Sequence, residues 1–503
     1  KQKKQQLITK RERKRNKDLD TSSSDIEPDF ETQTANLNAR RPIRNLINPE
    51  IGDSQQENNR NKFKLLFLKE SPEEIKRRKA EASKKLTIKS ESDLEVDIED
   101  VYNQSSPLDI PIRPKWSYDM TKEQLDQQEK KYISEYLDKI CDNYQDQELS
   151  YFEMNLETWR QLWRVTEISD IILIIVDVRY SPLHFSPKFY EYCTDILKKD
   201  IILILNKIDL IPSSVVIAWK NYFESKFPNL HVVLFSSAKQ IKHKRKKARK
   251  SGESSKDVDQ EYELEVKALA AEINTAKAHR KLYECVKKIV KNQVDLSGWS
   301  KMTEELCKKS TISEPFEAIG KMNISENEVE IMDSLYFGEV PRVKYEHGFV
   351  TIGCCGFPNV GKSSLLNSLN GRKVVSVSRT PGHTKHLQTI FLTKNVRLCD
   401  CPGLVFPSLV CKPLQIIAGI YPISQLQEPY SAIRYIAERI PLIENFDLKH
   451  PSETSSQNNN DWSPLDICEA WAIKRGYFTA KASRPDVFRA ANELLRMTLD
   501  GAI

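Results

Sequence analysis

Long apolar runs are missing from this sequence. No stretch approaches the ~20 consecutive apolar residues that a helix needs to cross a bilayer, and an apolar run at residues 171–176 ends at Asp177. A secretory signal is not visible either. We therefore expect no membrane partner. The sequence begins with Lys1 rather than Met, and we expect it to be a piece of a longer protein.

Paired cysteine motifs are also missing. The chain has ten cysteines, but none of them form the C-x-x-C pairs typical of a zinc site. Cys354, Cys355 and Cys399 lie inside predicted strands. This pattern favours buried thiols of a reducing compartment, with a metal or disulfide set as the alternative.

Aromatic and apolar residues are scarce at the start of the chain. Residues 1–59 are polar and contain few side chains from which a core could be built, so we predict that they are disordered. Residues 1–15 are rich in Lys and Arg, which is typical of nuclear import or of contact with an RNA backbone. A solvated tail with no such role is the alternative.

A phosphate-binding loop is the clearest motif that is present. Residues 356–363 fit G-x-x-x-x-G-K-[ST], between a strand-like run at 349–355 and a helix-like segment. In such a loop the backbone N–H groups point at phosphate oxygens, at a helix N-terminus that already favours anions. Lys362 can reach the β- and γ-phosphates, and the Ser363 hydroxyl can hold Mg²⁺. The loop residues predicted to bind nucleotide are Asn359, Val360, Gly361, Lys362, Ser363 and Ser364.

Two motifs at predicted strand ends indicate that the base is guanine. Asp209 follows the apolar run at 201–205 and can accept hydrogen bonds from the ring N–H and the exocyclic amine of guanine. Adenine offers no such pair, which argues against an ATPase. Ala238 follows the strand-like run at 232–235, and its N–H could meet the guanine oxygen. The predicted base-binding residues are Asn206, Lys207, Asp209, Ser237, Ala238 and Lys239.

A third strand-end motif supplies groups for the metal and the γ-phosphate. Asp400-Cys401-Pro402-Gly403 follows the short strand-like run at 396–399. The Asp400 carboxylate could hold Mg²⁺ through water, and the Gly403 N–H could meet the γ-phosphate. Each motif alone is weak evidence for a site that binds a guanine nucleotide, but four such motifs at strand ends in one chain are strong evidence for it.

These segments resemble the G1, G3, G4 and G5 motifs of a Ras-like GTPase, in the order G4, G5, G1, G2, G3. That order is typical of the circularly permuted (YlqF-type) GTPases, and the similarity covers about residues 156–239 and 347–501. The resemblance implies an α/β fold: a circularly permuted Ras-like P-loop GTPase domain with a small all-α C-terminal domain. It also implies GTP and GDP as ligands, Mg²⁺-dependent hydrolysis of GTP, and ribosomal RNA or a pre-ribosomal particle as partner, with protein regulators.

The resemblance assigns further roles by position. Residues 379–385 correspond to the switch segment, in which Thr384 would coordinate Mg²⁺ beside Ser363 and Asp400. Lys362, Thr384 and Gly403 are therefore the predicted catalytic residues. Within the switch, His383 is either a proton shuttle or a plain surface histidine.

Two positions bear on the rate of hydrolysis. Leu404 stands where a standard GTPase has the glutamine that orients water, so we expect slow intrinsic hydrolysis unless a partner or an ion helps. The phosphate-binding loop resembles that of GTPases in which K⁺ binds near the β- and γ-phosphates. This resemblance implies that Asn359 helps to hold K⁺ there. The alternative is that Asn359 only shapes the loop.

The remaining segments complete the predicted organisation. We expect an exposed helix at 73–82, a docking helix near 156–164, a structural turn at 177–183, a long helix at 259–290 and an irregular stretch at 297–341. The basic cluster at 242–250 is a second nuclear or nucleolar signal, a phosphate-backbone contact, or a solvated loop. The predicted regions are 1–115 (largely disordered), 116–170 (helical lead-in), 171–239 and 347–411 (GTPase domain), 240–346 (insert with helix), and 412–503 (helical domain).

The leading hypothesis is a GTPase that acts on a ribosomal precursor in the nucleus or nucleolus, with the cytoplasm as an alternative location. A regulatory GTP-binding protein with a protein partner and negligible turnover is the second hypothesis. The third is a scaffold in which the nucleotide is only structural. Gly403 is followed within about ten residues by the helical domain, so we expect movement of the switch to act directly on that domain.

Overall fold

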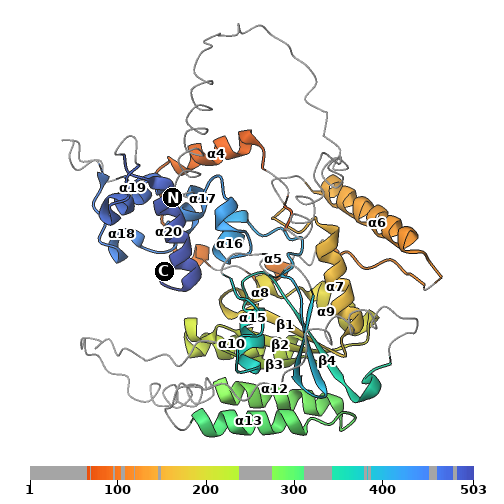
Figure 1. Cartoon of the computed structure of the whole chain (residues 1–503). Coiled ribbons are helices and arrows are strands. Elements are labelled where there is room, and N and C mark those ends of the chain that lie inside the picture. The colour runs from red at the N-terminus through yellow and green to blue at the C-terminus, as the bar shows by residue number, and fades with distance from the viewer. Residues whose placement is uncertain are drawn as a thin grey trace, which may run out of the picture. The chain divides into compact units, whose positions relative to one another are not determined.

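The computed structural model describes residues 65–67, 70–94, 97–102, 108–117, 119–144, 149–236, 275–310, 343–378, 382, 384, 387–451, 461–479 and 484–503 (Figure 1). Several predictions lie outside these residues: the basic arm at 1–15, the turn at 237–239, the basic cluster at 242–250, and His383.

Six strands form one sheet in the order β3-β2-β1-β4-β6-β5 (Figure 1). The strands are β1 (Ile171–Asp177), β2 (Asp200–Asn206), β3 (His231–Leu234), β4 (Val350–Cys355), β5 (Gln388–Thr393) and β6 (Val396–Asp400). Neighbouring strands in this sheet are parallel, except that β5 runs antiparallel to β6. All residues of β1 and β4 are buried, as expected for continuous apolar strands that are covered on both faces.

The sheet is assembled from two segments that meet at the β1–β4 pair. Ile171 is paired with Ile352, and beside this pair the Asp170 carboxylate accepts a hydrogen bond from the Thr351 N–H at 2.7 Å. We call β1–β3 with their loops the base half and β4–β6 with their loops the phosphate half. The strand order is that of a chain that starts at β4 and continues from β6 into β1. The prediction of a permuted α/β GTPase fold is therefore confirmed.

Helices cover the sheet, and α7 (Leu156–Ile168) is the first of them. It packs on β4, and Trp159 and Trp163 are at most 1% exposed, which agrees with the predicted docking helix. Helix α10 (Ser213–Lys226) packs on β3, and α15 (Lys362–Leu369) packs on β6.

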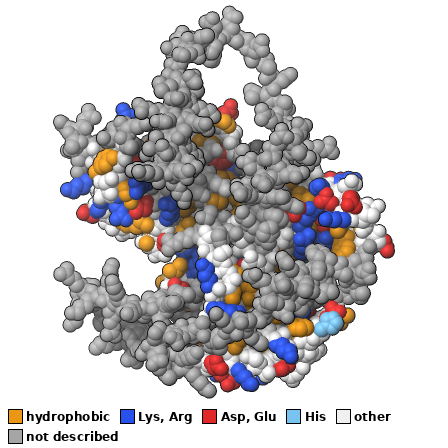
Figure 2. Space-filling view, viewed as in Figure 1, with side chains coloured by type: hydrophobic (Ala, Val, Ile, Leu, Met, Phe, Trp, Pro, Cys, Tyr) orange, Lys and Arg blue, Asp and Glu red, His pale blue; other side chains and the backbone are white. Residues whose placement is uncertain are grey.

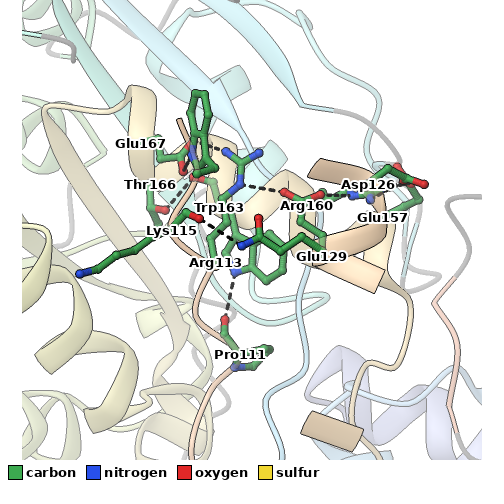
Figure 3. Close-up of polar contacts among 12 residues, drawn as sticks. Pro111, Arg113, Lys115, Asp126, Glu129, Glu157, Arg160, Trp163, Thr166 and Glu167 are labelled. Atoms are coloured by element: carbon green, nitrogen blue, oxygen red, sulfur yellow. Dashed lines mark hydrogen bonds and ion pairs between the residues drawn. The ribbon is translucent and has the colours of Figure 1, made fainter. Parts of the chain in front are cut away.

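An ion-pair network joins α7 to α6 (Lys122–Asn143) (Figure 3). Glu129, which is 3% exposed, accepts hydrogen bonds from the Nε atoms of Arg113 at 2.9 Å and Arg160 at 2.7 Å. Arg113 also donates to Glu167 at 2.7 Å, and the Trp163 indole donates to the Pro111 carbonyl at 2.9 Å. A carboxylate this well buried is tolerated because two guanidinium groups surround it.

The described part of the insert, residues 275–310, contains two helices, whereas we expected one helix in the insert. Helix α12 (Thr275–Val290) buries Ala278, Leu282 and Val286, one face of helical spacing, and packs on β3. Helix α13 (Ser297–Ser310) packs on α12 and β5, so the prediction of an irregular stretch at 297–341 is wrong for its first part. Trp299, which is 1% exposed, anchors this helix. The sequence does not indicate this role, because the residues around Trp299 are mainly polar.

The C-terminal region is helical. Its elements are α16 (Lys412–Ile417), η6 (Ile423–Gln425), α17 (Tyr430–Ala437), α18 (Leu442–Asn445), α19 (Pro464–Arg475) and α20 (Val487–Asp500). Ser463 caps α19 and Asp486 caps α20, as their sequences indicate. Helices α17, α19 and α20 pack on one another through faces that include Ile433, Leu494 and Leu495.

A helix also occurs in the region that we predicted to be largely disordered. Helix α4 (Pro72–Ala82) is capped by the Ser71 hydroxyl and packs on α17 (Figure 1). Arg78 pairs with Glu70 and with Glu74, both at 2.7 Å. The helix that we expect at 73–82 is therefore confirmed, and the structure adds that this polar helix is held by the partner on which it packs.

The face shown in Figure 2 carries basic side chains over the C-terminal helices and along α6, and acidic side chains are interspersed with them. Among the described residues, no helix has both the length and the apolar character needed to cross a membrane.

Candidate functional site

The phosphate loop connects β4 to α15, and two of its glycines have no room for a side chain. Gly361 has φ +100°, and a Cβ there would lie 2.2 Å from the Asn206 amide nitrogen. Gly356 has φ +149°, and a Cβ would lie 2.4 Å from the Ile175 carbonyl oxygen. The base half therefore presses directly against the loop, and only glycine permits this approach.

Lys362 lies at the floor of this loop. Its side chain is 6% exposed, and Nζ donates hydrogen bonds to the carbonyl oxygens of Gly356 at 3.1 Å and Phe357 at 2.7 Å. Burial lowers the pKa of Lys362, although the nearby Asp400 carboxylate acts in the opposite direction. Lys362 is also the first residue of α15, and the N-terminus of a helix after such a loop is where a phosphate would bind.

The three predicted Mg²⁺ ligands come together next to Lys362. The Ser363 hydroxyl donates to Asp400 Oδ2 at 3.0 Å and lies 3.4 Å from the Thr384 hydroxyl. Burial raises the pKa of Asp400, and Lys362 and the two hydroxyl groups oppose this. Asp400 Oδ1 is buried, and among the described residues it has no hydrogen-bond partner. An unsatisfied carboxylate oxygen beside two hydroxyl groups suits a hard cation such as Mg²⁺, so these residues fit the ion.

The base-binding residues follow β2. Asn206 is fully buried, and its amide donates to the Val360 carbonyl of the phosphate loop at 2.7 Å. Lys207 has φ 61°, and its Nζ donates to Asp177 Oδ2 at 2.8 Å. Asp209 accepts a hydrogen bond from the Ser236 hydroxyl at 2.6 Å. The carboxylate is thus held between the turns that follow β2 and β3, while the predicted contacts at Ser237, Ala238 and Lys239 lie outside the described residues.

One cavity of about 360 Å³ connects most of these groups. The predicted site residues that line it are Asn206, Lys207, Asn359, Gly361, Lys362, Ser363, Ser364, Thr384 and Gly403. Asp209, Val360 and Asp400 do not line it. Residues from both halves of the sheet therefore share one cavity, which is long enough to include the loop and the end of β2.

Helices of the C-terminal region also line this cavity, and we did not predict their contribution. The added lining residues are Ala418, Tyr421, Ile423, Ser424, Arg496, Leu499 and Asp500. The Asn359 amide donates to the Gly419 carbonyl at 2.9 Å, which ties the phosphate loop to the segment after α16. No local sequence signal identifies these residues as part of the site, because they lie after the last nucleotide-binding motif and do not form a motif themselves.

Leu404 occupies the position of the water-orienting glutamine. Its side chain is 2% exposed, and its N–H donates to the Gly356 carbonyl at 3.2 Å. A buried apolar side chain cannot hydrogen-bond a water molecule. Gly403 packs closely on the phosphate loop, since a Cβ there would lie 2.7 Å from Pro358 Cα.

Comparisons with known proteins agree with this geometry. A family described as "50S ribosome-binding GTPase" matches residues 351–455. Mouse (Mus musculus) guanine nucleotide-binding protein-like 1 is 47% identical over 450 residues, which are 88% of this chain and 72% of that protein. Large subunit GTPase 1 of Saccharomyces cerevisiae is 34% identical over 408 residues, 79% of this chain and 57% of that protein.

Among solved structures, the GDP-bound structure of TM YlqF is similar at 14% identity and a TM-score of 0.33, over 68% of this chain and 95% of that one. The identity to the mouse protein and its coverage settle the family, and the strand order settles the arrangement of the motifs. The chain belongs to the guanine nucleotide-binding protein-like 1 family, and it is a circularly permuted GTPase.

Proposed function

We propose that the protein binds GTP with Mg²⁺, hydrolyses it slowly to GDP and phosphate, and uses this reaction in ribosome assembly. The observation that carries the reaction is the cluster of Ser363, Thr384 and Asp400 beside the buried ammonium group of Lys362. The ribosomal role is supported by the names of the matching family and of the yeast relative, which refer to the 50S ribosome and to the large subunit.

The residues divide the chemistry as follows. Lys362 and the N–H of Gly403 stabilise the charge that develops on the γ-phosphate as water attacks it. Ser363, Thr384 and Asp400 would hold Mg²⁺, which would neutralise charge between the β- and γ-phosphates. Since the side chain of Leu404 is apolar, this chain has no glutamine there to orient the water, and intrinsic turnover is slow.

Potassium is part of this proposal. The side-chain nitrogen of Asn359 donates a hydrogen bond to the Gly419 carbonyl. The side-chain oxygen of Asn359 would then be the atom that binds K⁺ near the β- and γ-phosphates. K⁺ would then stabilise developing charge, as an arginine finger does. Hydrolysis should be several-fold faster in K⁺ than in Na⁺ buffer. Equal rates in the two buffers would assign Asn359 to loop shape alone.

The switch would act on the C-terminal helices. Helix α16 begins at Lys412, shortly after Gly403, and its following turn contacts the loop through Asn359. Loss of the γ-phosphate would thus change how the helical region is held. The ribosomal particle would be bound in the GTP state and released after hydrolysis.

Co-sedimentation tests the partner. The full chain, loaded with GDP or with a non-hydrolysable GTP analogue, is centrifuged with pre-ribosomal particles over a range of salt concentrations. We expect salt-sensitive co-sedimentation with the analogue and less with GDP. Hydrolysis measured with and without Mg²⁺ and particles completes the test, and binding that ignores the nucleotide contradicts the switch.

A regulatory GTP-binding protein with a protein partner is the second candidate. The buried Leu404 favours it, because negligible turnover suits a protein that waits for an activator. No co-sedimentation in either nucleotide state, together with no turnover, would favour this candidate.

We also propose a nuclear or nucleolar location on the basis of the basic segments at 1–15 and 242–250. A fluorescent fusion that lacks both segments tests it.

A further inference from the structure

The last helix of the chain reaches the proposed nucleotide site. Arg496, Leu499 and Asp500 of α20 line the cavity that the phosphate loop and Lys207 also line. None of these three residues belongs to a nucleotide-binding motif. Their position raises the question of what holds α20 against the GTPase domain and what its side chains do there.

Arg179 attaches the end of α20 to the base half. Its guanidinium group donates to the carbonyl oxygens of Thr498 at 3.1 Å and Leu499 at 3.2 Å, which are among the last carbonyls of the helix. The same group pairs with Asp177, at 2.8 Å to Oδ2. A cation at the C-terminus of a helix satisfies carbonyl groups that have no partner within the helix.

Asp177 links this attachment to the base half. It is 1% exposed and pairs with both Arg179 and Lys207, each at 2.8 Å. Burial acts to raise the pKa of Asp177, but the two cations hold it below its usual value, so the carboxylate is charged. The Asp177 carboxylate therefore pairs with the lysine of the base-binding motif and with Arg179, which in turn holds the end of α20.

Two apolar contacts fix the helix end further. Gly501, just after α20, packs on the side chain of Leu210, next to Asp209. Leu499 packs on Gly419, whose carbonyl holds the Asn359 amide. The end of α20 is thus in contact with the base side and with the phosphate-loop side of the cavity.

Among the described residues that line this cavity, Arg496 is the cation without a hydrogen bond or ion pair. Its side chain is exposed. The other basic lining residues are occupied, since Lys207 pairs with Asp177 and Lys362 bonds to loop carbonyls. Asp500, one turn further along, is negative and would repel phosphate. A nucleoside di- or triphosphate with Mg²⁺ remains an anion, and Arg496 is suited to bind it.

We propose that α20 is part of the nucleotide site: Arg496 contacts the phosphates of the bound guanine nucleotide, and Arg179 is a positioning residue that holds α20 there. This inference rests on the proposed function and extends the nucleotide site to the C-terminal region. Because Arg179 lies on the base side, away from the switch, this attachment of α20 does not depend on the γ-phosphate, whose loss would act on the other contact of the helical region, between Asn359 and Gly419.

The first test compares ligands with and without phosphate. Dissociation constants of GDP, a GTP analogue and guanosine are measured for the full chain, for Arg496→Ala and for Arg496→Lys. We expect Arg496→Ala to weaken both nucleotides roughly five- to tenfold and guanosine less than about twofold, since a charged hydrogen bond to phosphate is lost. Arg496→Lys should recover part of the loss because it keeps the charge.

Arg489→Ala is the matched control. Arg489 is an exposed arginine of the same helix, but it stacks on the Tyr477 ring and does not line the cavity. It should leave all three affinities within about twofold. Equal behaviour of Arg496→Ala and Arg489→Ala overturns the assignment of Arg496, and so does an equal loss of guanosine affinity.

The second test asks whether Arg179 acts through α20. Arg179→Lys keeps a cation beside Asp177 but loses the guanidinium fork that binds two carbonyls, so it is safer for folding than Arg179→Ala. We expect the Arg179→Lys single variant to weaken GDP roughly three- to fivefold, and adding Arg496→Ala to it to cost less than about twofold more. If the loss of GDP affinity in the double variant equals the product of the losses in the two single variants, Arg179 does not act through α20 and its positioning role is overturned.

The base-recognition variant separates this inference from the proposed function. If Asp209→Asn shifts the base preference while Arg496→Ala changes nothing, the GTPase stands and the role of α20 falls. If the unmodified chain binds no guanine nucleotide, the proposed function itself is wrong.

Discussion

The two halves of the sheet hold their functional groups in different ways. In the phosphate half the contacts are short in sequence, such as Lys362 to Phe357 and Ser363 to Asp400. In the base half some contacts are also local, such as Asp209 to Ser236, but others extend across the chain, from Asn206 to Val360 and from Arg179 to the end of α20. The phosphate half can therefore be deduced from its motifs, whereas the base half depends on its partners.

Lys362→Ala breaks the phosphate half alone and should have the largest effect. Its ammonium group is the buried cation of the loop, so we expect GTP affinity to fall roughly a thousandfold. Calorimetric titration with a GTP analogue measures this. Lys373→Ala, an exposed lysine shortly after α15, is the control and should bind normally. A loss below about tenfold would mean that Lys362 does not face the phosphates.

Asp209→Asn changes the base half alone. An amide cannot accept both guanine N–H groups, but it can donate to the extra carbonyl of xanthine. We expect GTP affinity to fall roughly a hundredfold while xanthosine triphosphate binds better than to the unmodified chain. Competition between the two nucleotides measures the preference. Unchanged GTP affinity would show that Asp209 does not recognise the base, whatever Ser236 does to hold it.

Asn206→Ala cuts one of the hydrogen bonds between the two halves, at the nucleotide site. It leaves the buried Val360 carbonyl without the 2.7 Å hydrogen bond, so the free energy of unfolding should fall by about 2 kcal/mol. Asn395→Ala removes an exposed amide that bonds to the Asp295 carbonyl and should cost less than about 0.5 kcal/mol. Chemical denaturation of both variants measures the difference. Similar losses would mean that Asn206 contributes little to joining the halves.

His184→Phe tests the boundary between the halves by pH. His184 lies in the base half against Phe357 of the phosphate loop, and burial lowers its pKa from 6.5 to about 4. The unfolded chain takes up this proton below pH 6.5 and the folded chain only near pH 4, so stability falls as the pH drops through this window. His184 should account for a loss of about 2 kcal/mol near pH 5.

The variant should lack this part of the acid loss. His279, whose pKa burial also lowers to about 4, titrates in both proteins, so the difference between the two pH profiles isolates His184. Denaturation midpoints from neutral pH down to about pH 4.5 give the measurement. Parallel profiles would show that His184 is not kept neutral by the fold.

Much of the fold and of the phosphate site could be predicted from the sequence. Continuous apolar runs indicated β1 and β2, and the loop motif placed Lys362 because its geometry depends on adjacent residues. The role of Arg179 could not be predicted, because its partners are carbonyl groups 319 and 320 positions away, and backbone atoms carry no sequence signal. The partner of helix α4 could not be predicted for the same reason, since packing on α17 rather than its own apolar content holds this helix.

The β1–β4 pair has a consequence for biosynthesis. Thr351, which bonds to Asp170 beside this pair, is 181 positions further along the chain. At translation rates of about 5–20 residues per second, β1 emerges roughly 10–40 seconds before its neighbour and meanwhile exposes an apolar edge that can pair with other chains. During that interval the exposed edge of β1 must therefore be kept from pairing with other chains. The nucleotide site is incomplete until the second segment has left the translating ribosome, so nucleotide cannot regulate the protein before then.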